Sequence, residues 1–206
     1  DDSIMKIYFS PFSPFVRKCL IAAQELGLGT EITLLPANVH PVQRDQSVIA
    51  LNPLGKVPTL LIDDGQVLYD SRVICEYLND MVGGSLIPAC GGARWAALTL
   101  QSLGDGMLDG AVLARYEEAA RPKALRWDAW RAGQLDKVET SLAFLDAQPQ
   151  LLDGEVFDIG QIAIACALWY LDLRFTDFGW RERFPAVARW YADACQRPSL
   201  RMAWSL

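Results

Sequence analysis

Basic residues are in the minority in this sequence and nowhere form a cluster. The 206 residues include 19 lysines and arginines against 25 aspartates and glutamates, which gives a formal net charge of −6. A negative chain without a run of lysine and arginine lacks the positive surface that nucleic acid or an anionic membrane attracts. We therefore expect neither nucleic acid nor a membrane as a partner.

Long apolar runs and paired cysteine motifs are also missing. No run of about 18 apolar residues is present to cross a bilayer, and the N-terminus shows no signal-peptide pattern. We expect a cytoplasmic location. The cysteines are odd in number and form no CxxC pair, which argues against a disulfide framework and a zinc site. We expect no metal, and buried thiols at most of the five positions, Cys19, Cys75, Cys90, Cys166 and Cys195.

The patterns that are present change near residue 85. Before it, strand and helix signals alternate: a strand over Met5–Phe9, a helix from Pro14, a strand over 31–35 and a short helix near 44–50. A strand, a helix and a strand within about 30 residues form a right-handed βαβ unit with parallel strands. Glycines and a proline follow at 83–88, and beyond them long helical patterns replace the strand signals.

Two domains follow from this change, 5–84 and 90–206. For the second we predict only helices, over 93–119, 122–147, 159–171 and 185–196. Asp158 and Gln161 have the spacing of a capping box at the start of the third of these helices. In the first of these helices, 93–119, Asp105 and Asp109 are accompanied by glycines that cost helix stability. We expect a close backbone approach to offset that cost.

The stretch 51–71, LNPLGKVPTLLIDDGQVLYDS, predicts a β-hairpin followed by a helix. A strand over 57–62 and a return strand over 66–69 are joined by Asp64-Gly65, a typical two-residue turn. Pro58 has no N–H for a central ladder, so it must occupy a bend, and a cis Val57-Pro58 bond suits that position. The Val57 N–H and C=O would then be free to pair with an extended peptide ligand.

Two helix starts carry side chains of chemical interest. Ser13 before Pro14 provides a hydroxyl cap and then a proline at the first helical position. Asp70-Ser71 opens the helix after the hairpin, with apolar positions at Ile74 and Leu78. A helix N-terminus with a hydroxyl is a natural anion site.

In this order and spacing, these motifs resemble those of bacterial cytosolic glutathione S-transferases over essentially the whole chain from Met5. The motifs are Ser13-Pro14, the segment 52–58 with Val57-Pro58, Asp70-Ser71, and a helical half with Arg197-Pro198-Ser199. The resemblance implies a thioredoxin-like N-terminal domain, βαβαββα, that binds glutathione as co-substrate, and an all-α C-terminal domain that contributes the pocket for a hydrophobic electrophile. It also implies a homodimer.

The resemblance further implies roles for individual residues. Val57 would pair with the cysteinyl backbone of glutathione beside cis-Pro58. Asp70 and Ser71 would hold the γ-glutamyl end, because a carboxylate suits the ammonium group and a hydroxyl at a helix start suits the carboxylate. Lys56 and His40 are candidates for the glycyl carboxylate. Phe12 and Asp105 are further candidates on the glutathione side, and Arg115 and Tyr116 for the border of the electrophile pocket.

Ser13 is the candidate catalytic residue. A free thiol of pKa about 8.5 is mostly protonated at neutral pH, whereas the thiolate is the nucleophile. The Ser13 hydroxyl can donate to the sulfur while the helix N-terminus adds a favourable field. The alternative is that Ser13 only caps its helix. Ser10 is a rival for the same role, and Tyr8 a weaker one because it lies within a strand.

Three functions fit the resemblance. The favoured one is a detoxifying transferase that conjugates glutathione to a small hydrophobic electrophile. A glutathione-dependent isomerase, lyase or dehalogenase and a non-catalytic binding module are the alternatives. The first loop has Ser13 and not a cysteine, which argues against the disulfide reductase and dehydroascorbate reductase branches.

Overall fold

The computed structural model describes residues 5–154 and 156–206. Its N-terminal part contains a four-stranded mixed sheet in the order β2-β1-β3-β4. The first strand pairs in parallel with the second and antiparallel with the third, which forms a hairpin with the fourth. The strands are β1 (Met5–Phe9), β2 (Ile32–Pro36), β3 (Thr59–Ile62) and β4 (Val67–Leu68).

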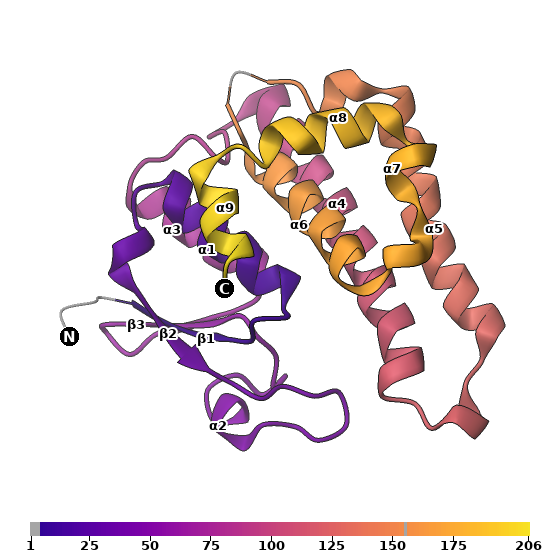
Figure 1. The fold of residues 1–206 in the computed structure, drawn as a ribbon. Coiled ribbons are helices and arrows are strands. Elements are labelled where there is room, and N and C mark those ends of the chain that lie inside the picture. Colours follow the sequence, from indigo (N-terminus) through magenta and orange to yellow (C-terminus); the bar gives the residue numbers. More distant parts are fainter. Residues whose placement is uncertain (1–4, 155) are drawn as a thin grey trace.

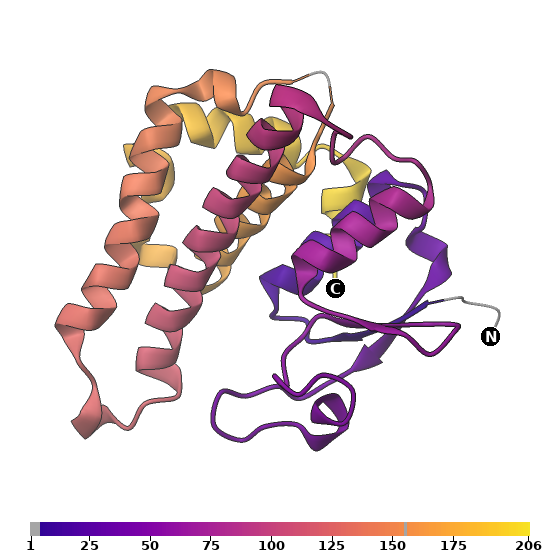
Figure 2. The ribbon, with the colours of Figure 1, turned by 180° about the vertical axis from the view of Figure 1, so that it is seen from behind.

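Three helices alternate with these strands in the predicted order βαβαββα. They are α1 (Pro14–Glu25), α2 (Gln46–Ile49) and α3 (Ser71–Met81). Helices α1 and α3 cover one side of the sheet, and α2 lies on the other side (Figures 1 and 2). Gly27 and Gly65 have φ of 74° and 85°, the left-handed region that lets the chain leave α1 and turn the hairpin without strain.

The hairpin strands are shorter than predicted. The strand expected from Val57 begins at Thr59, because the cis Val57-Pro58 bond bends the chain first. The return strand ends at Leu68, and a second cis bond, Tyr69-Asp70, follows. The predicted cis proline is therefore confirmed, whereas the cis bond before Asp70 has no sequence signature.

The C-terminal part is helical, as predicted. Its helices are α4 (Gly91–Ala119), α5 (Asp128–Ala147), α6 (Ile159–Arg174), α7 (Trp180–Arg183), α8 (Pro185–Ala194) and α9 (Pro198–Trp204). The second predicted helix starts later, at Asp128, after a 3₁₀ turn at Lys123–Leu125. The prediction of a last helix at 185–196 was incomplete, because Pro198 begins a further helix. The predicted domains, 5–84 and 90–206, divide between the end of α3 and the start of α4, and this division remains a prediction.

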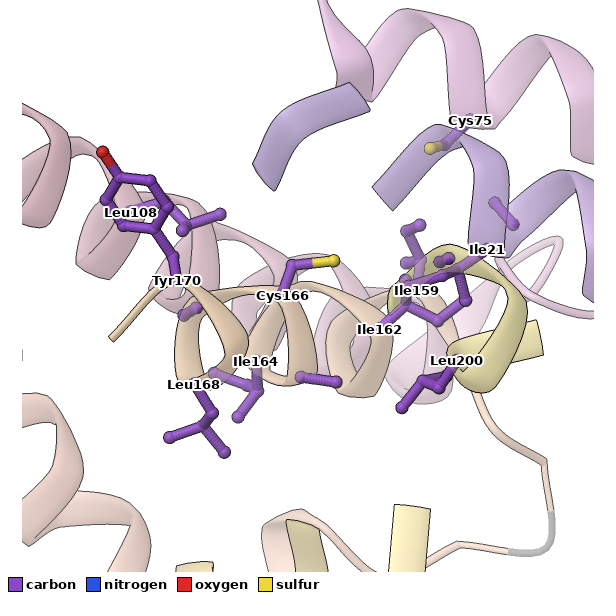
Figure 3. Close-up of a cluster of buried hydrophobic side chains, with 14 of the residues drawn as sticks. Ile21, Cys75, Leu108, Ile159, Ile162, Ile164, Cys166, Leu168, Tyr170 and Leu200 are labelled. Atoms are coloured by element: carbon purple, nitrogen blue, oxygen red, sulfur yellow. The ribbon is translucent and has the colours of Figure 1, made fainter. Parts of the chain in front are cut away.

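Helix α6 is buried along almost its whole length and organises the helical core. The predicted capping box at its start is present, with Asp158 accepting from the Gln161 N–H and the Gln161 side chain accepting from the Asp158 N–H. Figure 3 shows Cys166 and Tyr170 pointing to one side of α6, and Ile164 and Leu168 to the other. The first side is the one on which α1 lies, so α6 contacts both parts of the protein.

Two glycines of α4 allow the backbones of α6 and α5 to approach closely. A Cβ on Gly104 would lie 2.7 Å from the Ala163 carbonyl carbon, and one on Gly110 would lie 2.8 Å from the Gln134 oxygen. The expected backbone approach is confirmed at these two positions. Gly106 would meet nothing within 4 Å, so the same explanation fails there.

The C-terminal helix α9 returns to the N-terminal part and packs on α1 (Figures 1 and 2). Arg197 and Ser199 both donate to the carboxylate of Glu25 at the end of α1, at 2.7–2.9 Å for the two Arg197 bonds and 2.5 Å for Ser199. This junction fixes the C-terminal end of α1 against the helical part.

Candidate functional site

The predicted site residues meet at one end of the sheet. Because β1 and β3 are antiparallel with Tyr8 opposite Thr59, the chain leaves β1 where it enters β3. The antiparallel pairing of Leu60 with Leu68 brings the end of β4 to the same place. The loop from Ser10 to Ser13, the Val57-Pro58 bend and Asp70-Ser71 are therefore neighbours at this end, although they are far apart in sequence.

Ser13 caps α1, as predicted. Its Oγ accepts from the Val16 N–H at 3.3 Å, and its own N–H donates to the Ser10 carbonyl at 3.0 Å. The residue is half-buried at the positive end of α1. An oxygen that accepts one bond still has its O–H to donate, so the cap and a bond to a thiolate are compatible.

The other serine of this loop has a local role. The Ser10 Oγ accepts from the Phe12 N–H at 3.4 Å, which shapes the turn before Ser13. Phe12 is 56% exposed. Tyr8 lies half-buried within β1, away from the loop tip.

The bend before β3 exposes the edge predicted to bind a peptide. Pro58 is buried and Val57 is half-buried, and the hydrogen bonds described for the chain include none from the Val57 backbone. Asn52, which is 1% exposed, holds the bend in place. Its amide donates to the Lys56 carbonyl at 3.3 Å and to Thr59 Oγ1 at 2.9 Å, and its oxygen accepts from the Leu54 N–H.

The two candidates for the glycyl carboxylate lie on exposed loops. Lys56 is exposed next to the bend. His40 is exposed, and its Nδ1 accepts from the Val42 and Gln43 N–H groups at 3.2 and 3.1 Å. The ring is therefore held in a local turn, and only its other nitrogen is left to face a ligand.

Asp70 is the N-cap of α3, and Ser71 follows it inside the helix. Asp70 Oδ1 accepts from the Arg72 N–H at 2.9 Å. Burial raises the pKa of the Asp70 carboxyl, but the N–H and the guanidinium of Arg72 outweigh it, and the net direction is downward. Ser71 is the first helical residue and is 3% exposed. Its hydroxyl is thus not needed for the cap.

Beneath this helix start lies an ion pair that the sequence did not suggest. Lys18 is fully buried, and its Nζ lies 2.7 and 2.8 Å from the two carboxylate oxygens of Asp105. Burial alone would lower the pKa of Lys18, but Asp105 raises it, so the amine stays charged. Arg72 Nε lies 3.8 Å from Asp105 Oδ2 and its Nη2 lies 3.3 Å from Asp70. A line of charges therefore runs from α1 through α4 to the cap of α3.

Asp109 lies one turn beyond Asp105 on α4. Burial and the Asp105 charge raise its pKa, while Arg72 and Lys56 lower it. The Arg72 and Lys56 charges come from α3 and from the loop before β3. This face of α4 is consequently within the field of the candidate glutathione residues.

The helical part also reaches the Ser13 loop. The Arg174 guanidinium lies over the Phe12 ring, 4.8 Å from its centroid. Burial raises the pKa of both Tyr170 on α6 and Tyr116 on α4, and Tyr170 also feels Arg174 and Arg115. The predicted border residues Arg115 and Tyr116 are thus grouped with two residues of α6 that sequence reasoning missed.

Three residues that build the site had only weak signals. Lys18 is a charged residue in an amphipathic helix, where a lysine ordinarily faces solvent. Asn52 precedes a proline and reads as an ordinary turn residue, and Arg72 follows a helix start as many arginines do. Each depends on a partner distant in sequence, so no local pattern distinguishes it.

Among residues 5–154 and 156–206, no helix is both long and apolar enough to cross a membrane. The same residues contain no group of three or more histidine, cysteine or acidic side chains arranged to hold a metal ion.

A thioredoxin-like sheet with a cis-proline bend, followed by a helical domain that packs on α1, defines the glutathione S-transferase fold. Comparisons with known proteins agree. Residues 12–81 match the glutathione S-transferase N-terminal domain, and residues 128–193 match the C-terminal domain. The chain belongs to the glutathione S-transferase family.

Individual relatives cover nearly the whole chain. The GST-like protein YibF of Escherichia coli is 35% identical over 200 residues, 95% of this chain and 96% of that protein. A glutathione transferase family member from Pseudomonas fluorescens with bound glutathione superposes with a TM-score of 0.93 at 44% identity, covering 97% of this chain and 98% of the other. A second Pseudomonas fluorescens structure, with bound S-(propanoic acid)-glutathione, has a TM-score of 0.89 at 43% identity and the same coverage.

Proposed function

We propose that this protein is a glutathione transferase that ionises the glutathione thiol and adds the sulfur to a small hydrophobic electrophile. The observation that carries the proposal is the meeting of Ser13, the free backbone of Val57 and the start of α3 at one end of the sheet. Glutathione bound in a relative at 44% identity supports the same ligand here. In this proposal glutathione is a co-substrate, and no metal takes part.

The tripeptide would lie along this end of the sheet. Its cysteinyl N–H and C=O pair with the Val57 backbone, as in strand addition. Its γ-glutamyl carboxylate accepts from Ser71 and the first N–H groups of α3, and its ammonium faces Asp70, whose lowered pKa keeps it ionised. Lys56, with His40 beyond it, faces the glycyl carboxylate.

Ser13 would act on the sulfur. Its O–H donates to the thiolate, and the N-terminus of α1 stabilises the negative charge. The thiol proton leaves to solvent, and the thiolate forms a C–S bond with the electrophilic carbon as the leaving group departs with its electron pair. Phe12 and Ser10 shape the loop around the sulfur. Asp105 remains a candidate to bind the ammonium group, in competition with Lys18, which already pairs with its carboxylate.

A homodimer, located in the cytoplasm, is the form in which we expect this activity. Support comes from exposed apolar side chains on α3, just after it and at the start of α4, and the Arg94–Glu76 ion pair joins these two helices. They are Val73, Met81, Val82 and Trp95, between 37% and 66% exposed. Sedimentation equilibrium tests this: a single monomeric species at micromolar concentration would contradict the homodimer.

The decisive experiment is an ultraviolet difference titration of the purified protein with glutathione, which follows thiolate absorbance from about pH 5 to about pH 9, across the ordinary thiol pKa of about 8.5. We expect saturable binding, with thiolate appearing well below pH 8. S-methylglutathione, which binds but has no thiol, is the control and should give no thiolate band. Binding without ionisation would point to a non-catalytic carrier, and no binding would contradict the proposal altogether.

A further inference from the structure

Arg174 stands on the helical side of the candidate site, opposite the loop that carries Ser13. It ends α6, and its guanidinium stacks over Phe12, the residue before Ser13, with 4.8 Å between the guanidinium carbon and the ring centroid. Phe12 is itself 56% exposed. The charge is thus placed at the outer border of the position proposed for the glutathione sulfur.

This arginine has no acidic partner in the part of the chain that the structure describes. Nine ion pairs are formed there, and none involves Arg174 or Arg115. The Arg174 Nε is moreover buried without a hydrogen-bond partner. Arg181 and Arg197, by contrast, each pair with a carboxylate. A guanidinium that lacks acceptors within the protein is a place where a ligand acceptor gains affinity.

Tyr116 and Arg115 act on Tyr170 together with Arg174, and all of these side chains are hydrogen-bond donors. Burial raises the pKa of Tyr170 and Tyr116, so both hydroxyls keep their protons at neutral pH. Arg174 and Arg115 both lower the pKa of Tyr170, so two positive charges act on this hydroxyl. The side of α6 that carries Tyr170 is the side on which α1 lies (Figure 3).

We propose that the electrophilic co-substrate carries a carboxylate, which the guanidinium of Arg174 binds with the help of Tyr170 and Arg115. A planar guanidinium offers two parallel N–H groups to a carboxylate, and such charge-assisted bonds are among the strongest available. The contact with the Phe12 ring helps to hold the guanidinium in place. This inference rests on the proposed transferase function and specifies its substrate class.

A matched pair of chlorinated aromatic compounds tests it, 4-chloro-3-nitrobenzoate and the neutral 4-chloro-3-nitrobenzamide. In both, the thiolate forms a C–S bond at the ring carbon, the C–Cl bond breaks and chloride leaves with the bonding electrons, while the thiol proton goes to solvent. The products are glutathione conjugates that differ only in a carboxylate or an amide. Their affinities, measured by calorimetry, report binding independently of turnover.

In the unaltered protein we expect the carboxylate conjugate to bind about tenfold more tightly than the amide conjugate, the gain typical of a charge-assisted pair. Arg174→Met should remove most of this preference, and Arg174→Lys should retain part of it. Arg189→Met, at an exposed arginine of α8, is the control and should change nothing. The ratio of kcat/KM for the two chlorinated compounds should follow the same order.

Equal affinities for the two conjugates in the unaltered protein would overturn the inference, as would a preference that survives in Arg174→Met with an unchanged circular dichroism spectrum. A loss of affinity for glutathione itself in Arg174→Met would also overturn it, because the arginine would then belong to the tripeptide site. If the unaltered protein binds no glutathione, the proposed function fails first. If it binds glutathione but does not discriminate, only the substrate class is wrong.

Discussion

Lys18 and Asp105 form a buried ion pair across the boundary between α1 and α4, with Nζ–O distances of 2.7 and 2.8 Å. The two residues are 87 positions apart. Their side chains are 0% and 7% exposed, so neither charge can be satisfied by water if its partner is removed. Asp105 also contacts Arg72, which in turn pairs with the Asp70 cap of α3. The ion pair therefore links the packing of the two parts to the candidate glutathione site.

Removing one partner of this pair should cost more than removing both. Lys18→Met leaves the buried Asp105 charge with only the longer contact to Arg72, and breaking a buried pair in this way typically costs about 3–5 kcal/mol. The double change Lys18→Met with Asp105→Leu should recover most of that loss, because two apolar side chains replace two charges. Urea unfolding of the single and double variants measures it. A double variant whose loss equals the sum of the single losses would show that the two residues do not act as a pair.

Ser13→Ala should slow conjugation roughly tenfold, about 1.4 kcal/mol of transition-state stabilisation, while glutathione affinity stays within a few-fold. It should also lower stability by about 1 kcal/mol, because the Val16 N–H loses its cap. Single-turnover rates and thermal unfolding separate the two effects.

Ser13→Asp is the matched control for this position. A carboxylate still caps the helix but places a negative charge beside the sulfur, so stability should return while the rate stays low. If Ser13→Asp reacts as fast as the unaltered protein, Ser13 serves only as a cap and the thiolate role passes to Ser10.

Ser71→Ala should weaken glutathione binding about fivefold to tenfold without loss of helix stability, since a ligand hydrogen bond contributes about 1 kcal/mol. The effect on glutathione binding can be separated from an effect on helix stability because Asp70, and not Ser71, caps α3. Asp70→Asn keeps a capping oxygen and removes the charge, so it tests the ammonium contact at the same helix start. Isothermal calorimetry with glutathione decides both, and unchanged affinity in Ser71→Ala would remove this hydroxyl from the site.

Glu25→Gln should destabilise the junction of α1 with α9 near neutral pH and have less effect in acid. Burial raises the pKa of Glu25, but the bonds from Arg197 and Ser199 outweigh it, and the pKa is lower than in the unfolded chain. Such a group stabilises the fold above the unfolded value of about 4.3, and its contribution is lost as pH falls through the lower folded value.

The expected difference between Glu25→Gln and the unaltered protein is about 1–2 kcal/mol at neutral pH, shrinking below about pH 4. Urea unfolding at several pH values measures it. Glu76→Gln, which breaks the Arg94 pair at a carboxylate side chain 53% exposed, is the control and should cost under about 0.5 kcal/mol. A difference that does not change with pH would contradict the assignment to the Glu25 charge.

Two glycines that lie two positions apart in α4, Gly104 and Gly106, should respond in opposite directions to alanine. Gly104→Ala places a Cβ 2.7 Å from the Ala163 backbone, so α4 and α6 must separate at a cost of about 1–3 kcal/mol. Gly106→Ala meets nothing within 4 Å and should stabilise the helix by about 0.5–1 kcal/mol. Equal effects on thermal unfolding would mean that the α4–α6 contact is looser than the structure shows.

The sequence by itself determined what depends on neighbours along the chain. Ser13-Pro14, the Asp158 capping box, the turn at Asp64-Gly65 and the bend at Val57-Pro58 were all predicted, because a cap or a turn is set by residue types at fixed short spacings. Family resemblance in the order of these motifs then fixed the element order βαβαββα and the helical second half.

Only the tertiary structure decided which distant residues meet. No local pattern pairs Lys18 with Asp105, brings Arg174 over Phe12 or docks α9 on Glu25, because these contacts arise from the way that the helices pack. The cap of α3 shows the same limit at short range: both Asp70 and Ser71 are good capping residues, and the backbone path out of β4 selected Asp70. Local chemistry fixed the elements, whereas packing chose the partners that build the site.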